Sequence, residues 1–337
     1  MKSPYTGKEM VRRLRAETVN FRKESFPILY HFYWDEEGGE ELTDEELENL
    51  NLNQVYNQYR ERYNLPFPDQ IKEIRDKYGL VQTKMAEVLG FGVNMYRQYE
   101  NGEIPTISNA RLIQLAEDPA EFRKLVNTSI NVLDDKALQE VNVRIDTLLA
   151  EQHNFHFNGL PQYLMSGGST DKVTVYTGYR KPSLRRLTEM IVFFAAEVKP
   201  WKTQLNKLLF YSDFYHYKKT AYSISGAEYY AIPMGPVPNN FNSIFEYVAQ
   251  NEEVTICYHE FQEGRYGEEF LPRDGRNFEA RLFSKEELET LKAVKLALGR
   301  KPTKEIIEIS HDELAWKENI GAKTKISYKY AFDLKYM

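Results

Sequence analysis

Short helical patterns separated by glycines occupy residues 66–126, and they constrain the fold of this chain more than any other feature. Apolar residues recur there at helical spacing in stripes, and Gly79, Gly90 and Gly102 stand between the stripes, where helices end. Prolines mark the beginning of the segment. The spacing predicts roughly four or five short helices, which make a small bundle.

Within this bundle, residues 80–102 predict two helices of about nine residues joined by a short turn that contains glycine. This is the helix-turn-helix arrangement, whose second helix lies in the major groove of DNA. On that helix, polar residues at i, i+3, i+4 and i+7 share one face, Tyr96 and Tyr99 share the other, and Met95 lies at the boundary. The candidate DNA-contacting residues are Gln82, Asn94, Met95, Arg97, Gln98 and Asn101.

The chemistry of these side chains suits DNA. Asparagine and glutamine can pair with adenine and arginine with guanine, and Gln82, near the start of the first helix, could donate to a phosphate. Two observations weigh against DNA binding: any amphipathic helix turns polar residues outward, and residues 69–126 carry a net charge of 8 − 9 = −1. Periodicity therefore leaves a DNA-binding face and a plain solvated face as alternatives.

The N-terminal segment, residues 1–65, combines strands with one helix. Residues 11–33 mix β-branched and aromatic side chains and predict two or three short strands. Thr43 and Glu46 have the spacing of a capping box, and we expect a helix of about twenty residues from there to Tyr63.

The rest of the chain predicts a helix, a linker and an α+β domain. Residues 134–152 have one apolar face, and residues 156–172 collect glycine, serine and proline, which indicates a linker or exposed loop. In the last domain we expect helices at 183–198, 201–218 and from a Ser284–Glu287 capping box to 298, strands at 228–234, 253–262 and 266–271, and a strand end at 235–238. The expected fold is a mainly helical α+β protein with segments 1–65, 66–126, 127–175 and 176–337.

Composition and charge exclude several classes of protein. Cys257 is the only cysteine, which rules out an intrachain disulfide and a zinc site built from several thiolates. The longest apolar run, residues 190–196, is far shorter than the roughly 20 residues that span a bilayer, and the first residues hold no secretory signal. We therefore expect a cytoplasmic protein without a membrane partner. Because the net charge is −6, any nucleic-acid contact must be local.

The histidines do not indicate an enzyme. His153 and His156 form H-x-x-H, but no third metal ligand is adjacent, and polar residues near a helix end explain the pair. His216 and His311 each lie near an aspartate, yet neither an activated nucleophile nor a phosphate-binding glycine loop accompanies them. We expect no catalysis and no cofactor.

The helix-turn-helix segment carries family patterns. L-x-Q-x-x-x-A-x-x-L-G at residues 80–90, with Y-E-x-G and a proline after it, resembles the Cro/CI-type helix-turn-helix family, and G-F-G-V-N with Y-E-N-G is closer to the C-terminal domain of MqsA-type antitoxins. The resemblance implies a homodimer on a palindromic operator, with Asn94 and Gln98 facing the groove. Relatives favour arginine at position 98, and here Arg97 stands one step earlier, so the resemblance does not give the operator sequence. Glu100 is expected to have a structural role inside the domain, capping or bridging, and not to read bases.

The first residues resemble the same family in a degraded form. MqsA-type proteins open with a zinc ribbon whose first ligand pair is C-P-x-C, whereas this chain has Ser3 and Thr6 there, and residues 33–39, where the second pair falls, contain no cysteine. Hydroxyl groups are poor zinc ligands, so we expect no metal. Apolar packing is expected to replace it, from Phe21, Phe26, Ile28, Tyr30, Phe32 and Trp34.

The C-terminal segment also has a recognisable pattern. K-L-L-F-Y-S-D at residues 207–213, G-x-x-Y and G-P-V-P after it, and Ser310-His311 with Ala315-Trp316 near the end resemble the SocA-like or Panacea family over roughly residues 176–334. Members look like antitoxin domains that bind unrelated small toxins, and one branch delivers its toxin to a protease. Candidate toxin contacts are Tyr211, Tyr215, Tyr229 and Tyr230, although rings that pack inside are the alternative.

Three functions fit these patterns. The first is a type II antitoxin that neutralises a toxin through the C-terminal domain and represses its own operon through the helix-turn-helix. The second is a transcription regulator whose C-terminal domain senses another protein or a ligand. The third is a protease adaptor for a toxin.

Overall fold

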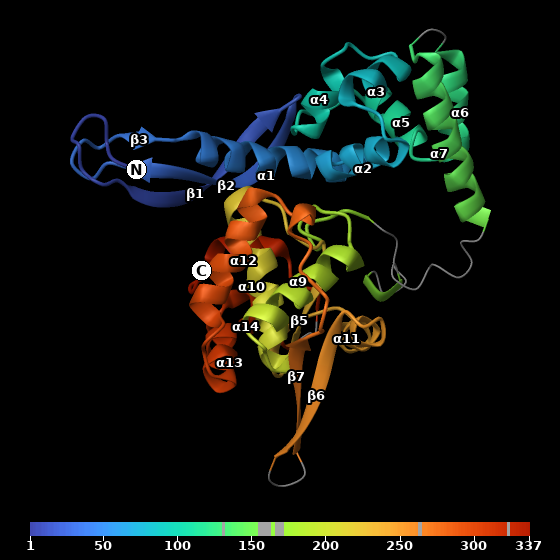
Figure 1. Cartoon of the computed structure of the whole chain (residues 1–337). Coiled ribbons are helices and arrows are strands. Elements are labelled where there is room, and N and C mark those ends of the chain that lie inside the picture. The colour runs from blue at the N-terminus through green and yellow to red at the C-terminus, as the bar shows by residue number, and fades with distance from the viewer. Residues whose placement is uncertain (130–131, 154–162, 166–171, 262–264, 322–323) are drawn as a thin grey trace. The chain divides into compact units, whose positions relative to one another are not determined.

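The computed structural model describes residues 1–129, 132–153, 163–165, 172–261, 265–321 and 324–337. By packing, the chain forms two compact units, residues 1–158 and 159–337 (Figure 1). The mainly helical α+β class expected from the sequence is confirmed. The four segments expected from the motifs stay a proposal, and the predicted linker at 156–172 lies almost wholly outside the described residues.

A long antiparallel hairpin opens the first unit. Strands β1 (Val11–Phe21) and β2 (Glu24–Trp34) pair over their full lengths, and β3 (Glu41–Leu42) pairs with the end of β2. The two turn residues, Arg22 and Lys23, both have positive φ, at 48° and 68°. A two-residue turn of this hand matches the twist of the strands, so the predicted short strands join into one continuous ribbon.

Helix α1 (Glu45–Tyr63) begins one residue later than its predicted capping box. The cap is Asp44, whose carboxylate accepts from the Leu47 amide at 3.0 Å, and the predicted box of Thr43 and Glu46 is wrong because Thr43 donates to Glu48 instead. An aspartate at this position caps at least as well as a threonine. The predicted end at Tyr63 is confirmed.

Amide side chains fasten α1 to the edge of β2. Asn51 exchanges two hydrogen bonds with the backbone of His31, at 2.8 and 2.9 Å, and Gln54 exchanges two with Leu29, at 3.0 and 2.8 Å. Gln58 adds a bond to the Pro27 carbonyl. The helix thus supplies the partners that a neighbouring strand would supply, which covers an otherwise open sheet edge.

The predicted bundle consists of α2 (Pro68–Tyr78), α3 (Gln82–Val88), α4 (Met95–Glu100), α5 (Ile107–Leu115) and α6 (Pro119–Thr128), and α7 (Asp135–His153) packs on α2 and α6. The predicted four or five helices are confirmed. A second core joins this bundle to the hairpin and α1, through Phe26, Ile28, Val55, Tyr59, Leu65, Ile104 and Ala110. The N-terminal segment therefore packs as part of the same unit.

Helix α10 (Lys202–Thr220) is the centre of the second unit, and thirteen of its nineteen residues are buried. Around it lie α9 (Leu184–Glu197), α12 (Lys285–Leu298), α13 (Thr303–Asp312), β5 (Gly235–Pro238), β7 (Arg265–Pro272) and the 3-10 helix η4 (Tyr328–Asp333). The remaining elements are β4 (Tyr229–Ile232), α11 (Phe241–Gln250), β6 (Val254–Phe261), η3 (Ala280–Leu282) and α14 (Leu314–Lys317).

The predictions for this unit hold with two exceptions. The Ser284–Glu287 capping box is confirmed, and each predicted helix and strand is present within two residues of its predicted ends. Residues 235–238 form β5 instead of only ending a strand, and α11 follows without having been predicted. Proline has no backbone N–H to donate. The prolines of β5 are tolerated because β5 pairs with β4 on one side, and its other edge needs no N–H donors.

Candidate nucleic-acid interface and a buried C-terminal cluster

The second helix of the predicted helix-turn-helix, α4, turns a polar face outward. Asn94, Arg97 and Asn101 are exposed, and Gln98 is half-buried on the same side. Asn94 and Asn101 are the two caps of the helix, so both stand at its ends with their side chains exposed. The predicted face therefore exists as a surface of amide and guanidinium groups.

Two buried tyrosines on the inward face of α4 hold this helix in place. Tyr96 is 0% and Tyr99 1% exposed. The Tyr96 hydroxyl donates to the Ile71 carbonyl at 2.8 Å, and Asn109 donates to the Tyr99 hydroxyl at 2.8 Å. Because these bonds tie α4 to α2 and α5, the outward face is rigidly presented. Met95 is half-buried against this core, so it contributes more to packing than to the surface.

The turn before α4 is built on Gly90. Its φ of 72° lies in the left-handed region, and the Phe91 amide reaches back to the Ala86 carbonyl at 2.8 Å. This is the hydrogen bond that closes a helix C-terminus on a glycine. It ends α3 after seven residues and redirects the chain toward α4.

A charged cluster joins the helices of the motif. Arg75 of α2 holds the Glu100 carboxylate with two bonds, at 2.6 and 3.2 Å, and Gln82 of α3 donates to the same carboxylate. The Glu100 side chain is only 5% exposed. The predicted bridging role of Glu100 is confirmed. The amide of Gln82 is thereby engaged inside the motif, which leaves it less able to donate to a phosphate than the sequence suggested.

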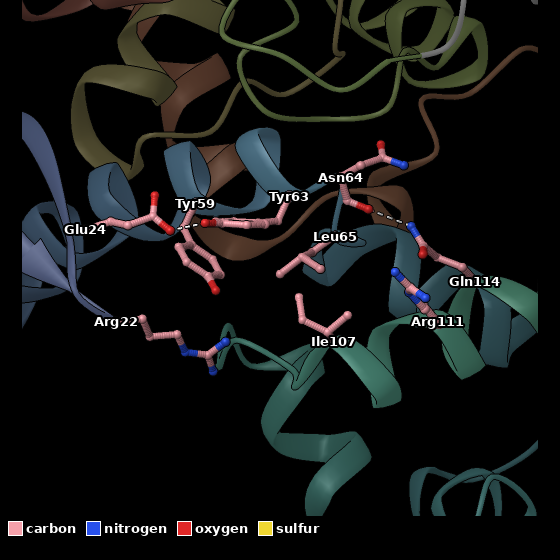
Figure 2. Close-up of a pocket in the computed structure, with 9 residues that line it drawn as sticks. All are labelled: Arg22, Glu24, Tyr59, Tyr63, Asn64, Leu65, Ile107, Arg111 and Gln114. Carbon is pink, nitrogen blue, oxygen red and sulfur yellow. Dashed lines mark hydrogen bonds between the residues drawn. The ribbon is translucent and has the colours of Figure 1, made fainter.

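A pocket of about 500 Å³ lies beside this motif, between the β1–β2 turn, the end of α1 and α5 (Figure 2). Arg22 from the turn donates to the carbonyls of Ile104 and Pro105, at 3.0 and 3.4 Å, in the loop that follows α4. Tyr63 and Arg62 bind Glu24 and lower its pKa. The complete lining is Arg22, Glu24, Tyr59, Tyr63, Asn64, Leu65, Ile107, Arg111 and Gln114. These contacts fix the loop after α4 to the hairpin.

In the segment that resembles a zinc ribbon, several hydrogen bonds converge on one carboxylate. Asp35, 3% exposed, accepts from the Ser3 hydroxyl at 2.5 Å and the Thr6 hydroxyl at 2.9 Å, and also from the amides of Glu37 and Gly38, both at 3.1 Å. These bonds, that from Ser3 foremost, lower the pKa of Asp35 to about 2. We call this arrangement the Asp35 clasp.

The clasp does not fit a zinc ion. Its donors are hydroxyl and carboxylate oxygens already hydrogen-bonded to one another, and a side chain at Gly38 would begin 2.9 Å from the Asp35 carboxylate. Across the residues that the structure describes, no group of three or more metal-ligating side chains gathers. Of the residues expected to replace the metal by apolar packing, Phe26 and Ile28 do pack in a core, and hydrogen bonds in addition close the loops at Ser3 and Asp35.

In the second unit, the K-L-L-F-Y-S-D motif lies on α10 and points inward. Asp213 is 0% exposed and accepts from the amides of Ile224 and Ser225, both at 2.8 Å, and from the hydroxyls of Ser225 and Tyr229, at 2.5 and 2.8 Å. Burial raises its pKa, and these four bonds oppose that effect. Asp213 thus stabilises the turn that leads into β4 by accepting its hydrogen bonds.

Lys207 occupies the other end of the motif. It is 0% exposed, donates to the Pro236 carbonyl at 3.0 Å, and has a pKa lowered by burial to about 7. Gly235 lies against it with φ of 97°, and a Cβ there would stand 2.5 Å from both Lys207 Cε and Ser310 Oγ. The glycine of G-P-V-P and the serine near the C-terminus therefore complete one packed cluster around Lys207.

The predicted tyrosine surface is only partly available. Tyr211 and Tyr229 are 0% exposed, and their hydroxyls donate to Glu313 at 3.1 Å and Asp213 at 2.8 Å. A partner cannot reach these rings in the folded unit, so their assignment to a binding face is corrected: α10 is buried on nearly every side, and its rings fill the core. Tyr215 and Tyr230 are half-buried and stay candidates.

The histidines singled out in the sequence have simple structural roles where the structure describes them. His216 is buried beside Thr290, and burial lowers its pKa to about 3. His311 stacks on Trp316 with ring centroids 3.8 Å apart. His156 and the side chain of His153 lie outside the described residues. No helix in the described part of the chain is both long and apolar enough to cross a membrane.

Comparison with protein families matches these two regions separately. Residues 1–127 match the family described as the antitoxin component of a bacterial toxin-antitoxin system, MqsA. Residues 205–317 match the family described as antitoxin SocA-like, Panacea domain. Both matched families are antitoxin families. The resemblances expected from the sequence are confirmed, and no curated protein matches the chain.

The match to the Panacea domain includes the buried residues of the two clusters around Asp213 and Lys207. Lys207, Asp213, Gly235 and Ser310 all lie within residues 205–317. Lys207 faces Gly235, Ser310 and the backbone of β5, and Asp213 faces the turn before β4, so this part of the antitoxin signature is a folding signature. The surface that meets a partner has to be sought elsewhere on the unit.

Proposed function

We propose that this protein is a type II antitoxin that neutralises a toxin protein by direct binding through its C-terminal domain and represses its own operon through the helix-turn-helix. The observation that carries the proposal is the coupling of two antitoxin-family segments in one chain, one of which presents a rigid polar helix face. The protein acts in the cytoplasm as a homodimer, without catalysis, cofactor or metal.

On the DNA side, Asn94, Arg97, Gln98 and Asn101 read base edges in this proposal. The exposed amides of α4 suit adenine, and Arg97 suits guanine. Met95 and Gln82 support the face from the core and from the Arg75–Glu100 cluster. Because the net charge of the chain is −6, the overall charge does not favour DNA, and in this proposal the affinity comes from local contacts.

The test of toxin neutralisation is growth of a bacterial host that expresses the product of the adjacent reading frame. That product is expressed alone, with the full chain, and with a full chain that carries Asn94→Ala and Gln98→Ala. Arrest that both versions of the chain relieve supports neutralisation that does not need the DNA-binding face. A neighbour that arrests nothing rejects the antitoxin proposal and favours a transcription regulator that senses another molecule.

The protease-adaptor alternative has a separate readout. If the chain delivers the toxin to a protease, the toxin level falls when the two are co-expressed. If the chain neutralises by occlusion, the toxin accumulates in a stable complex. Immunoblotting of the toxin after translation is stopped distinguishes these outcomes.

A further inference from the structure

The β6–β7 hairpin projects beyond the helices of its own unit (Figure 1) and carries exposed aromatic rings. At its base Val254 and Phe270 are buried, at 2% and 0% exposure. Farther out, Tyr258 is 70% and Tyr266 69% exposed. Large exposed rings on a protruding element are typical of a protein-binding surface, because tyrosine is enriched at such interfaces.

The two faces of this hairpin differ. On one face Phe261 and His259 pack against Trp201, with ring centroids 5.5 and 5.1 Å apart, and Gly267 leaves room for the indole. On the other face the register pairs Tyr258 with Glu268 and Glu260 with Tyr266. Neither tyrosine has a ring or hydrogen-bond partner among the described residues. We call this second side the tyrosine face.

A groove of about 360 Å³ continues the tyrosine face toward α11. Tyr258, Ile256 and Glu268 form its hairpin wall, and Phe245, Glu246 and Ala249 form its helix wall. It therefore joins an exposed tyrosine to a lining of mixed polar and apolar side chains, which suits a peptide segment that carries both kinds of group.

The free charge at this groove is negative. Its two cations are already neutralised, Lys202 by Glu268 at 2.7 Å and Arg273 by Glu252 at 2.8 Å. Glu246 is exposed and has no ion-pair partner in the described part of the chain. The same holds for Glu260 on the tyrosine face. Residues 254–272 contain four glutamates and one arginine, so the hairpin as a whole is acidic.

The backbone of the hairpin also offers a pairing edge. The outer edge of β7 is engaged at Glu269 by a bridge to Trp201. No described strand pairs with the outer edge of β6. A segment added along β6 would place every second side chain over the tyrosine face, as in recognition by strand addition.

We propose that the tyrosine face and its groove bind a basic, extended segment of the toxin. Arginine or lysine side chains of that segment stack on Tyr258 and Tyr266 and pair with Glu246 and Glu260. This inference rests on the proposed neutralisation of a toxin by the C-terminal unit, and it names the surface and the chemistry of the partner.

The test measures binding of the full chain to the purified product of the adjacent reading frame at low and high salt. Two variants change the surface: Tyr258→Ala with Tyr266→Ala, and Glu246→Lys with Glu260→Lys. Matched controls are Tyr5→Ala, which removes a tyrosine of 70% exposure from the other unit, and Glu289→Lys with Glu308→Lys, which reverses two exposed charges on α12 and α13.

We expect the double tyrosine replacement to weaken binding at least about 30-fold, the size of one interface hot spot. The charge reversal should weaken it at least as much and remove most of its salt dependence, while both controls bind like the parent. All four side chains are exposed, so unfolding temperatures should not change. The charge-reversal variant keeps the proposal testable if the tyrosine variant does fail to fold.

Each other outcome overturns the proposal in a recognisable way. If the parent binds the toxin and the hairpin variants bind equally well, the surface is wrong and the antitoxin function stands. If the hairpin variants change the oligomeric state in sedimentation but not toxin affinity, the occupant is a second copy of this chain. Salt-independent binding of the parent rejects a basic partner. If the parent does not bind the toxin at all, the proposed function itself fails.

Discussion

The chain carries two antitoxin signatures, and they place their polar side chains in opposite ways. In the helix-turn-helix, Asn94, Arg97 and Asn101 stand on the surface while the apolar half of α4 supports them. In the Panacea motif on α10, Lys207 and Asp213 are fully buried and bind the backbone of the following turn and strands. The first signature therefore points to a contact surface, and the second points only to the fold that carries one.

The largest expected effect comes from replacing Asp213, the buried acidic residue of the Panacea motif. Asp213→Ala leaves two amides and two hydroxyls without their acceptor in a buried position, and we expect a loss of more than about 4 kcal/mol in unfolding free energy of the second unit. Urea unfolding of the full chain measures it. Operator binding, which we propose for the first unit, should persist. A variant that unfolds like the parent would show that the motif is not a folding signature.

The buried Lys207 gives the second unit a distinctive pH dependence. Its pKa in the folded state, about 7, is below the ordinary value of 10.5, so folding favours the neutral amine. The unfolded state then binds more protons between these values, and stability rises as pH increases from 7 toward 9, below the range where tyrosines ionise. Lys207→Met should remove this rise. Thermal unfolding of both proteins across that range checks it, and an unchanged slope in the variant contradicts it.

Substitutions on the exposed face of α4 should lower the affinity for operator DNA and leave the stability of the fold unchanged. Asn94→Ala and Gln98→Ala are each expected to cost about 1–3 kcal/mol of operator affinity and to relax specificity at one base pair. Their unfolding temperatures should stay near that of the parent, since neither side chain lies in the core. Fluorescence anisotropy with operator DNA measures the effect, and Gln139→Ala, an exposed glutamine on α7, is the control. Parent-like affinity in both variants would disprove the recognition face.

The smallest expected effect lies at the Asp35 clasp. Its folded pKa of about 2 is below the ordinary 3.8, so the stability that the clasp contributes is present above the ordinary value and is lost as pH falls toward 2. Asp35→Asn should reduce the acid sensitivity of the first unit. A chelator should leave the unfolding of the parent unchanged, because hydrogen bonds close the loops. Stoichiometric zinc in the purified protein would overturn this interpretation.

Much of the secondary structure could be predicted from the sequence, because helix ends, caps and faces depend on residues that are close together in the chain. Gly79 and Gly102 mark helix ends through their backbone freedom, and Ser284 with Glu287 caps α12 as its spacing predicts. The outward face of α4 follows from its period alone. These features need only residues within a few positions of one another.

Other features depend on contacts between distant residues, and the sequence did not reveal them. Asn51 and Gln54 read as ordinary polar helix residues, yet they complete the edge of β2. The sequence left Tyr211 and Tyr229 open between a binding face and the interior, and they fill the core around α10. No periodicity could predict this, because α10 is buried on almost all sides and Asp213 finds its partners more than ten residues away.

By itself the sequence determined the mainly helical α+β class, the helix-turn-helix with its polar face, and both antitoxin resemblances, since period, turn chemistry and motif spacing are properties of neighbouring residues. Only the tertiary structure decided that the Panacea motif faces inward, that a carboxylate closes the loops at Ser3 and Asp35, and that the acidic tyrosine face stays open. Burial depends on which elements meet, and it is burial that separates a side chain that holds the fold from one that is free to bind.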